Sequence, residues 1–169
     1  MMATRFKRQR LAVFTVVLLT AGCTAAPPAQ QAPLLGAWRS SVQFETGALA
    51  GIKDLEFLYV FNAGGTMTES SNYDGAPPAP PAYGVWRSAG PNAFEARYEF
   101  FTTAPSGSDA FKSGGGWLPS GRGVLTERIT LSADGRTFTS TIRCEMFGMR
   151  GEPVEGSGAA QGQAERIGF

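Results

Sequence analysis

Apolar and polar side chains alternate along several stretches of this chain, and this period constrains the fold more than any other feature. Between residues 94 and 100, for example, aromatic or small apolar residues alternate with Glu and Arg. A period of two places one set of side chains on each face of a β-strand. No stretch from residue 34 onward has the 3.6-residue period of an amphipathic helix. The sequence therefore predicts an all-β domain.

Short segments rich in Gly, Asn and Asp separate these stretches and have the composition of tight hairpin turns. These residues adopt the left-handed backbone angles that such turns require. The clearest turns are expected at 62–65, 89–92 and 133–135. They divide the chain into eight predicted strands, at 34–44, 53–62, 65–71, 82–88, 93–103, 122–132, 136–147 and 159–168.

Consecutive strands joined by turns indicate an antiparallel up-and-down meander across residues 34–169. About eight strands of this kind can close into a barrel whose interior is filled or holds one small ligand. An open sandwich of two sheets is the structural alternative. The longer connections, expected at 72–81, 103–121 and 148–158, are candidates for functional loops or for tolerated insertions.

The amino-terminal end has the pattern of an export signal. Four positive charges at Arg5, Lys7, Arg8 and Arg10 precede an apolar run that extends to Gly22. A basic region, a short apolar region and small residues before a cleavage point are typical of a secretory signal. The apolar run is too short to span a bilayer, which takes roughly 20 apolar residues.

The sequence Leu-Thr-Ala-Gly-Cys at residues 19–23 resembles the lipobox of bacterial lipoproteins. The resemblance implies cleavage after residue 22 and acylation of Cys23, with fatty acids such as palmitate, so that residues 1–22 are a signal peptide. Residues 23–33 are rich in Pro, Ala and Gln and are expected to form a flexible tether. A secreted protein without a lipid is the alternative.

The residue after Cys23 is Thr24. In lipoproteins of this kind an Asp at that position signals retention at the inner membrane, so its absence implies the outer membrane. The expected location is therefore the cell envelope, with the domain attached to a membrane through its lipid anchor.

Composition excludes several classes of function. The whole chain has 15 basic and 14 acidic side chains, and the leader holds four of the basic ones, which leaves a mildly acidic domain without the electrostatic footprint for nucleic acid. The chain has no histidine, which rules out Ser-His-Asp catalysis and His-ligated metals. We predict no catalytic residue, cofactor or metal site. With Cys23 acylated, Cys144 would be a lone thiol.

Several short motifs resemble the lipocalin and wider calycin architecture. They are Leu35-Gly36-Ala37-Trp38, the segment 61–67 with two glycines, Gly84-Val85-Trp86-Arg87 and the last strand with Arg166. In that architecture a Trp on the first strand meets an Arg from the last strand across the closed end of the barrel. The resemblance implies this structural role for Trp38 and Arg166. A guanidinium over an indole face gains about 0.5–2 kcal/mol.

The predicted inward faces supply the candidates for a ligand cavity. Small residues at 160, 162 and 164 share one face of the last strand, and they leave room for bulky neighbours or for a cavity. One carboxylate, Glu127, shares the parity of apolar Leu125 and Ile129. It could anchor the polar group of a ligand, pair with Arg166, or face solvent at a strand end. The cavity candidates are Phe57, Tyr59, Trp86, Tyr98 and Glu127.

These features predict a membrane-anchored envelope lipoprotein whose barrel binds a small apolar ligand, such as an acyl chain. One alternative is a structural or interaction module with a filled barrel and no enzymatic activity. A further alternative is an isomerase of the allene-oxide-cyclase kind, which would use Glu127 with Tyr59 or Tyr98. An outer-membrane barrel also competes, because the chain ends in the aromatic Phe169 and such barrels also alternate apolar with polar residues.

Overall fold

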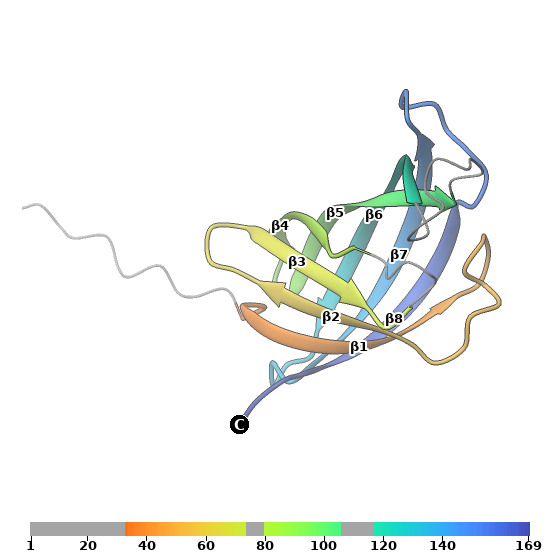
Figure 1. Ribbon diagram of the computed structural model, residues 1–169. Helices are drawn as coiled ribbons and strands as arrows, with labels where there is room; N and C mark the ends of the chain where they lie inside the picture. Colours follow the sequence, from red (N-terminus) through yellow and green to blue (C-terminus); the bar gives the residue numbers. More distant parts are fainter. Residues whose placement is uncertain (1–32, 74–79, 106–116) are drawn as a thin grey trace, which may run out of the picture. The chain divides into compact units, whose positions relative to one another are not determined.

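A computed structural model describes residues 33–73, 80–105 and 117–169 of the chain. They form eight strands without a helix (Figure 1). Cys23, the expected signal peptide and almost all of the expected tether lie outside the described residues. The strands are β1 Gly36–Phe44, β2 Leu55–Phe61, β3 Thr66–Ser71, β4 Ala82–Gly90, β5 Ala93–Pro105, β6 Trp117–Leu131, β7 Thr137–Gly148 and β8 Gly158–Arg166.

Each strand pairs antiparallel with the next one along the chain, and β8 returns to pair with β1. The pairing of Trp38 with Arg166 begins that last ladder, which continues to Phe44 and Ala160. The up-and-down meander and its closure into a barrel are therefore confirmed, and the open sandwich is excluded. A closed sheet has no unpaired edge, so every strand has hydrogen-bonded neighbours on both sides.

The connections divide the barrel into two ends. Short turns between β2 and β3, β4 and β5, and β6 and β7 lie at one end, together with the start of β1 and the end of β8 (Figure 1). Asn92 takes a φ of 57° in the second of these turns, as a tight hairpin requires. We call this the closed end. The opposite end, where the remaining connections lie, is the mouth.

One expected loop is partly strand. Residues 103–121 were predicted to be a long connection, but β5 extends to Pro105 and β6 begins at Trp117, with these two residues paired. The register shifts between Thr102 and Thr103, and this irregularity lets a glycine-rich sequence continue the hairpin. The connection is therefore shorter than its composition indicates.

The apolar side chains of the alternating pattern are the ones that are buried inside the barrel. In β2 the side chains of Leu55, Phe57, Tyr59 and Phe61 are buried, while those between them lie toward the outside. Most strands thus turn their apolar face inward, opposite to the arrangement of a barrel whose outer wall contacts lipid. Among the described residues, no helix has both the length and the apolar character to cross a membrane.

Aromatic rings fill the interior toward the closed end. Trp38 lies 5.0 Å from Phe138, and Tyr59 stacks 5.7 Å from Phe61, measured between ring centroids. The small face of β8 makes room for side chains rather than for a hollow. A Cβ added at Gly162 would lie 2.7 Å from the Ser140 hydroxyl oxygen. This part of the barrel is a packed core.

Candidate functional site

Trp38 and Arg166 meet at the closed end. The central guanidinium carbon of Arg166 lies 4.2 Å from the centroid of the Trp38 ring. Arg166 also donates to three backbone carbonyls, those of Pro33, Leu35 and Gly135. The Trp38 indole nitrogen donates to the carbonyl of Leu34 at 2.9 Å. These contacts join the first and last strands and close this end of the barrel.

Trp86, one of the five cavity candidates, also lies toward the closed end. Its ring packs edge-on against Phe61 and Phe94, at 6.0 and 5.9 Å between centroids. Its indole nitrogen donates to the carbonyls of Asn62 and Thr66, both at 3.1 Å. Trp86 therefore fastens the turn between β2 and β3.

Three further candidates meet in the middle of the barrel. The Tyr98 hydroxyl donates to Glu127 Oε2 at 2.9 Å, and it lies 3.4 Å from the Tyr59 hydroxyl. Glu127 is fully buried, with 0 % of its surface exposed. The prediction that Glu127 faces solvent is therefore wrong. The predicted pairing of Glu127 with Arg166 is also wrong, because Arg166 donates to backbone carbonyls at the closed end, whereas Glu127 accepts a hydrogen bond from Tyr98.

Burial sets the protonation of this group. It raises the pKa of the Glu127 carboxyl above its usual value, since an ionised carboxylate loses hydration inside a protein. Burial, reinforced by the charge of Glu127, also raises the pKa values of Tyr59 and Tyr98 well above the usual range. Both tyrosines therefore keep their protons at neutral pH. Within the described part of the chain, Glu127 Oε1 has no hydrogen-bond partner.

A second buried carboxyl, Glu69 on β3, escaped the sequence analysis. Only 6 % of its surface is exposed. Burial, together with the charge of Glu127, raises the pKa of Glu69 to about 8. Its Oε1 finds no partner among the described residues. The available signal was its parity with buried Met67 in a short strand of otherwise small polar residues.

The mouth holds a pocket of about 230 Å³, which we call the mouth pocket. Phe57 lines it, whereas the other four cavity candidates do not. Glu69 contributes a carboxyl to a wall that is otherwise largely apolar. None of the described residues that line it is Lys or Arg. Residues that form its walls include Leu49, Leu55, Phe57, Glu69, Phe100 and Met146.

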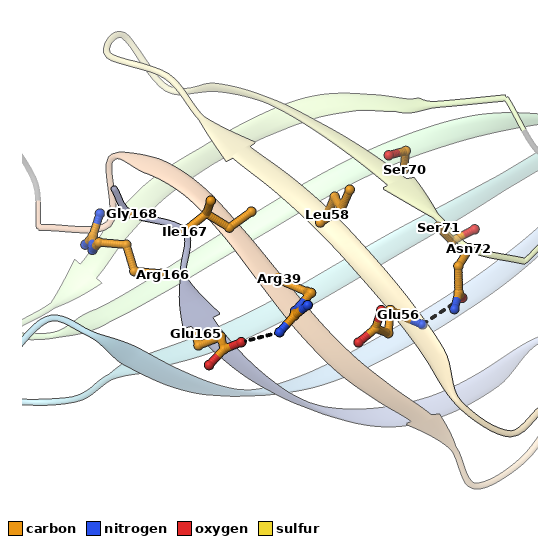
Figure 2. Close-up of a pocket in the computed structure, with 10 residues that line it drawn as sticks. All are labelled: Arg39, Glu56, Leu58, Ser70, Ser71, Asn72, Glu165, Arg166, Ile167 and Gly168. Carbon is orange, nitrogen blue, oxygen red and sulfur yellow. Dashed lines mark hydrogen bonds and ion pairs between the residues drawn. The ribbon is translucent and has the colours of Figure 1, made fainter.

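A larger hollow of about 590 Å³ lies on the outer wall of the barrel (Figure 2). Its lining includes the ion pair between Arg39 and Glu165, at 2.6 Å, together with Glu56 and Leu58. Both members of the ion pair are more than half exposed. Exposed pairs of this kind contribute little energy. This groove contains neither of the buried carboxyls, so the mouth pocket is the better candidate site.

No family model, curated protein or solved structure matches this chain. The site is therefore defined by its own geometry. Its features are a closed barrel, a packed core, and a small apolar pocket at the mouth with one carboxyl in its wall. The part of the chain that the structure describes has no cluster of three His, Cys, Asp or Glu side chains. The arrangement is compatible with a barrel that binds a small ligand.

Proposed function

We propose that this protein is an envelope lipoprotein whose barrel binds a small apolar ligand in the mouth pocket. The observation that carries the proposal is the pocket itself. It joins an apolar wall to a buried carboxyl oxygen on Glu69 that has no hydrogen-bond partner among the described residues. Ligand sites are typically concave and largely apolar, with a few polar groups that fix orientation. The mouth pocket has each of these properties.

The size of the pocket limits the ligand. Sites for drug-sized molecules have volumes of about 300–1,000 Å³, and the mouth pocket has about 230 Å³. A short-chain molecule fits this volume, whereas a long acyl chain would place only one end inside. The aromatic residues Tyr59 and Tyr98 fill the space beneath, so the ligand enters no deeper than Glu69.

The lipid anchor belongs to the same proposal. Acylation of Cys23 would hold the barrel at the envelope, and Thr24 in place of an Asp favours the outer membrane. Two or more acyl chains anchor a protein stably, since each buried methylene contributes about 0.8 kcal/mol. Intact mass spectrometry of protein purified from membranes tests this part. We expect a chain that begins at Cys23 and carries acyl groups, and an unmodified Cys23 would contradict it.

The packed core near the closed end favours a second candidate function, an interaction module without a ligand. Its large buried side chains, such as Trp38 and Phe138, are what a purely structural barrel needs. The isomerase alternative has less support from the structure than this second candidate. Tyr59, Tyr98 and Glu127 would have to touch substrate, yet all three are buried and none lines the mouth pocket.

Calorimetric titration with n-octanol separates binding from scaffolding. The full chain with Cys23→Ser keeps its length and removes the acylation site. We expect saturable one-to-one binding with an affinity in roughly the sub-millimolar range, because each buried methylene contributes about 0.8 kcal/mol. Ala48→Trp places a large ring in the pocket wall and should abolish binding.

The matched control is Ala89→Trp, which introduces the same ring on β4 near the closed end, at an exposed position. It should leave octanol binding unchanged. Binding that survives Ala48→Trp, or no binding to the parent chain, would contradict the proposed site.

A further inference from the structure

The charged side chains buried in the barrel interior are all acidic. Among the described residues, the buried polar or charged side chains are Ser40, Glu69, Glu127 and Ser140. No Lys or Arg joins them. Buried charges are normally paired, so two carboxyls without a cation are an unbalanced set.

Glu69 is the member of this set that a ligand can reach. It lines the mouth pocket, and only 6 % of its surface is exposed. Its Oε1 has no hydrogen-bond partner within the described residues. Ser40, Glu127 and Ser140 do not line this pocket, and Glu127 Oε2 accepts a hydrogen bond from the Tyr98 hydroxyl. An unsatisfied buried polar atom in a native structure calls for a partner.

Aromatic side chains line the mouth pocket together with Glu69. They are Phe57 and Phe100, and the more exposed Tyr73 and Phe101. The face of an aromatic ring attracts a cation. The mouth pocket therefore combines a carboxyl with several rings, and both attract positive charge.

We infer that the mouth pocket selects a ligand with a short apolar body and a protonated amine, and that Glu69 is the carboxylate that receives the ammonium group. This rests on the proposed function, because it specifies the ligand class of the same pocket. A carboxylate ligand would instead add a third acid to an interior in which none of the described buried side chains is a cation. An alcohol would leave the charge of the interior as it was.

Binding of the ammonium group moves one proton. In the free protein the Glu69 carboxyl is mostly protonated at about pH 7, since burial and the nearby Glu127 raise its pKa to about 8. A bound ammonium stabilises the ionised carboxylate, so Glu69 loses its O–H proton to the buffer and accepts a hydrogen bond from the ligand. No other bond forms or breaks. The remaining titratable groups around the pocket in the described chain are Tyr59, Tyr73, Tyr98, Glu127 and Cys144.

Three probes of equal chain length test the inference, namely n-octylamine, n-octanol and n-octanoate. Titration of the full chain carrying Cys23→Ser measures each affinity. We expect the amine to bind about tenfold to a hundredfold more tightly than the other two, as charge-assisted hydrogen bonds do. Titrations at about pH 7 in buffers of different ionisation enthalpy should show release of about one proton with the amine, and none with octanol.

The decisive variant is Glu69→Gln, which keeps the shape of the side chain and removes its charge. We expect it to lower amine affinity by about tenfold or more, to abolish proton release, and to change octanol affinity much less than amine affinity. The matched control is Glu56→Gln on the outer wall (Figure 2), which should alter neither affinity. If Glu69→Gln does not fold, the order of the three probe affinities and the proton release, both measured on the parent chain, still test the inference.

The failures are distinguishable. Octanoate or octanol binding as tightly as the amine, or amine binding without proton release, would overturn the inference and leave the ligand pocket standing. If none of the three probes binds, the proposed function itself is wrong, and the inference is wrong with it.

Discussion

The two ends of this barrel are built from the same eight strands but differ in how well their buried polar groups are hydrogen-bonded. At the closed end Arg166 donates to three backbone carbonyls and covers the Trp38 ring, and the Trp38 nitrogen is also bonded. At the mouth, one oxygen of Glu69 has no hydrogen-bond partner among the residues that the structure describes, and this side chain lines the mouth pocket. A region in which polar groups are satisfied favours stability, whereas unsatisfied polar groups are typical of sites that trade stability for function.

The length of the connections explains how one sheet sustains both ends. Short turns hold the strand ends together where Trp38 packs, whereas the described residues at the mouth line a pocket. The tyrosine pair of Tyr59 and Tyr98 lies between the two regions. It forms the boundary between packed core and pocket.

The largest expected difference between the ends is in stability. Trp38→Ala removes a ring that contacts both Phe138 and Arg166, and we expect the free energy of unfolding to fall by about 3–5 kcal/mol. Trp117→Ala is the control, since this ring is 39 % exposed at the start of β6. It should cost much less. Urea denaturation measures both, and equal losses would show that the closed end is not the stabilising region.

The next effect is a dependence of stability on pH that originates at the mouth. Glu69 has an ordinary pKa of 4.5 when exposed and a pKa of about 8 in the folded protein. Between these values the folded state holds a proton that the unfolded state has released, so stability falls as pH rises. We expect a loss of about 2–4 kcal/mol between about pH 5 and pH 8.

Urea denaturation at several pH values measures this loss. Glu69→Gln should remove most of it, and Glu127, whose pKa burial also raises, should account for the remainder. Glu56→Gln on the outer wall should keep the whole dependence. A parent protein equally stable at both pH values would show that the carboxyl at the mouth is not held in its neutral form.

A smaller effect is expected at the boundary between the regions. Tyr98→Phe removes the hydroxyl that donates to Glu127 Oε2 and leaves a buried carboxyl without its donor. The expected loss is about 1–3 kcal/mol. Tyr83→Phe provides the control, because Tyr83 is 65 % exposed on β4, and it should change stability little. Equal effects in denaturation would mean that the buried hydrogen bond contributes nothing.

The smallest effect compares two arginines. Arg166→Lys keeps the charge but loses the planar group that covers Trp38 and reaches several carbonyls, and we expect a loss of about 1 kcal/mol. Arg39→Lys alters an exposed pair with Glu165 and should cost less than about 0.5 kcal/mol. The difference in denaturation midpoint tests this ranking, and a larger loss for Arg39→Lys would reverse it.

The fold followed from the sequence because its signals are local. Alternation within each strand and glycine or asparagine in each turn act over a few residues, and together they imply a meander. The inward parity of Glu127 was readable in the same way, because Leu125 and Ile129 flank it. The sequence offered Tyr59 and Tyr98 as alternatives beside Glu127, and the register of the folded barrel makes Tyr98 the donor to its carboxyl.

The pocket was beyond the reach of local patterns. Whether inward aromatics line a cavity or fill it depends on how side chains from all the strands interlock, and here Tyr59 and Tyr98 fill while Phe57 lines. Glu69 was missed because small polar residues surround it in β3, where Met67 alone marks the inward face. A short strand gives too few residues to fix its parity.

The central claim is that ligands enter at the mouth and stop above a packed core, and methyl NMR during titration with uncharged n-octanol tests it most directly. We expect saturable shifts at Leu55, Leu125 and Met146, which line the mouth pocket, and no shifts at Leu34 or Leu131 near the closed end. Shifts at the closed end, shifts confined to Leu58 in the outer groove, or no shifts at all would contradict it.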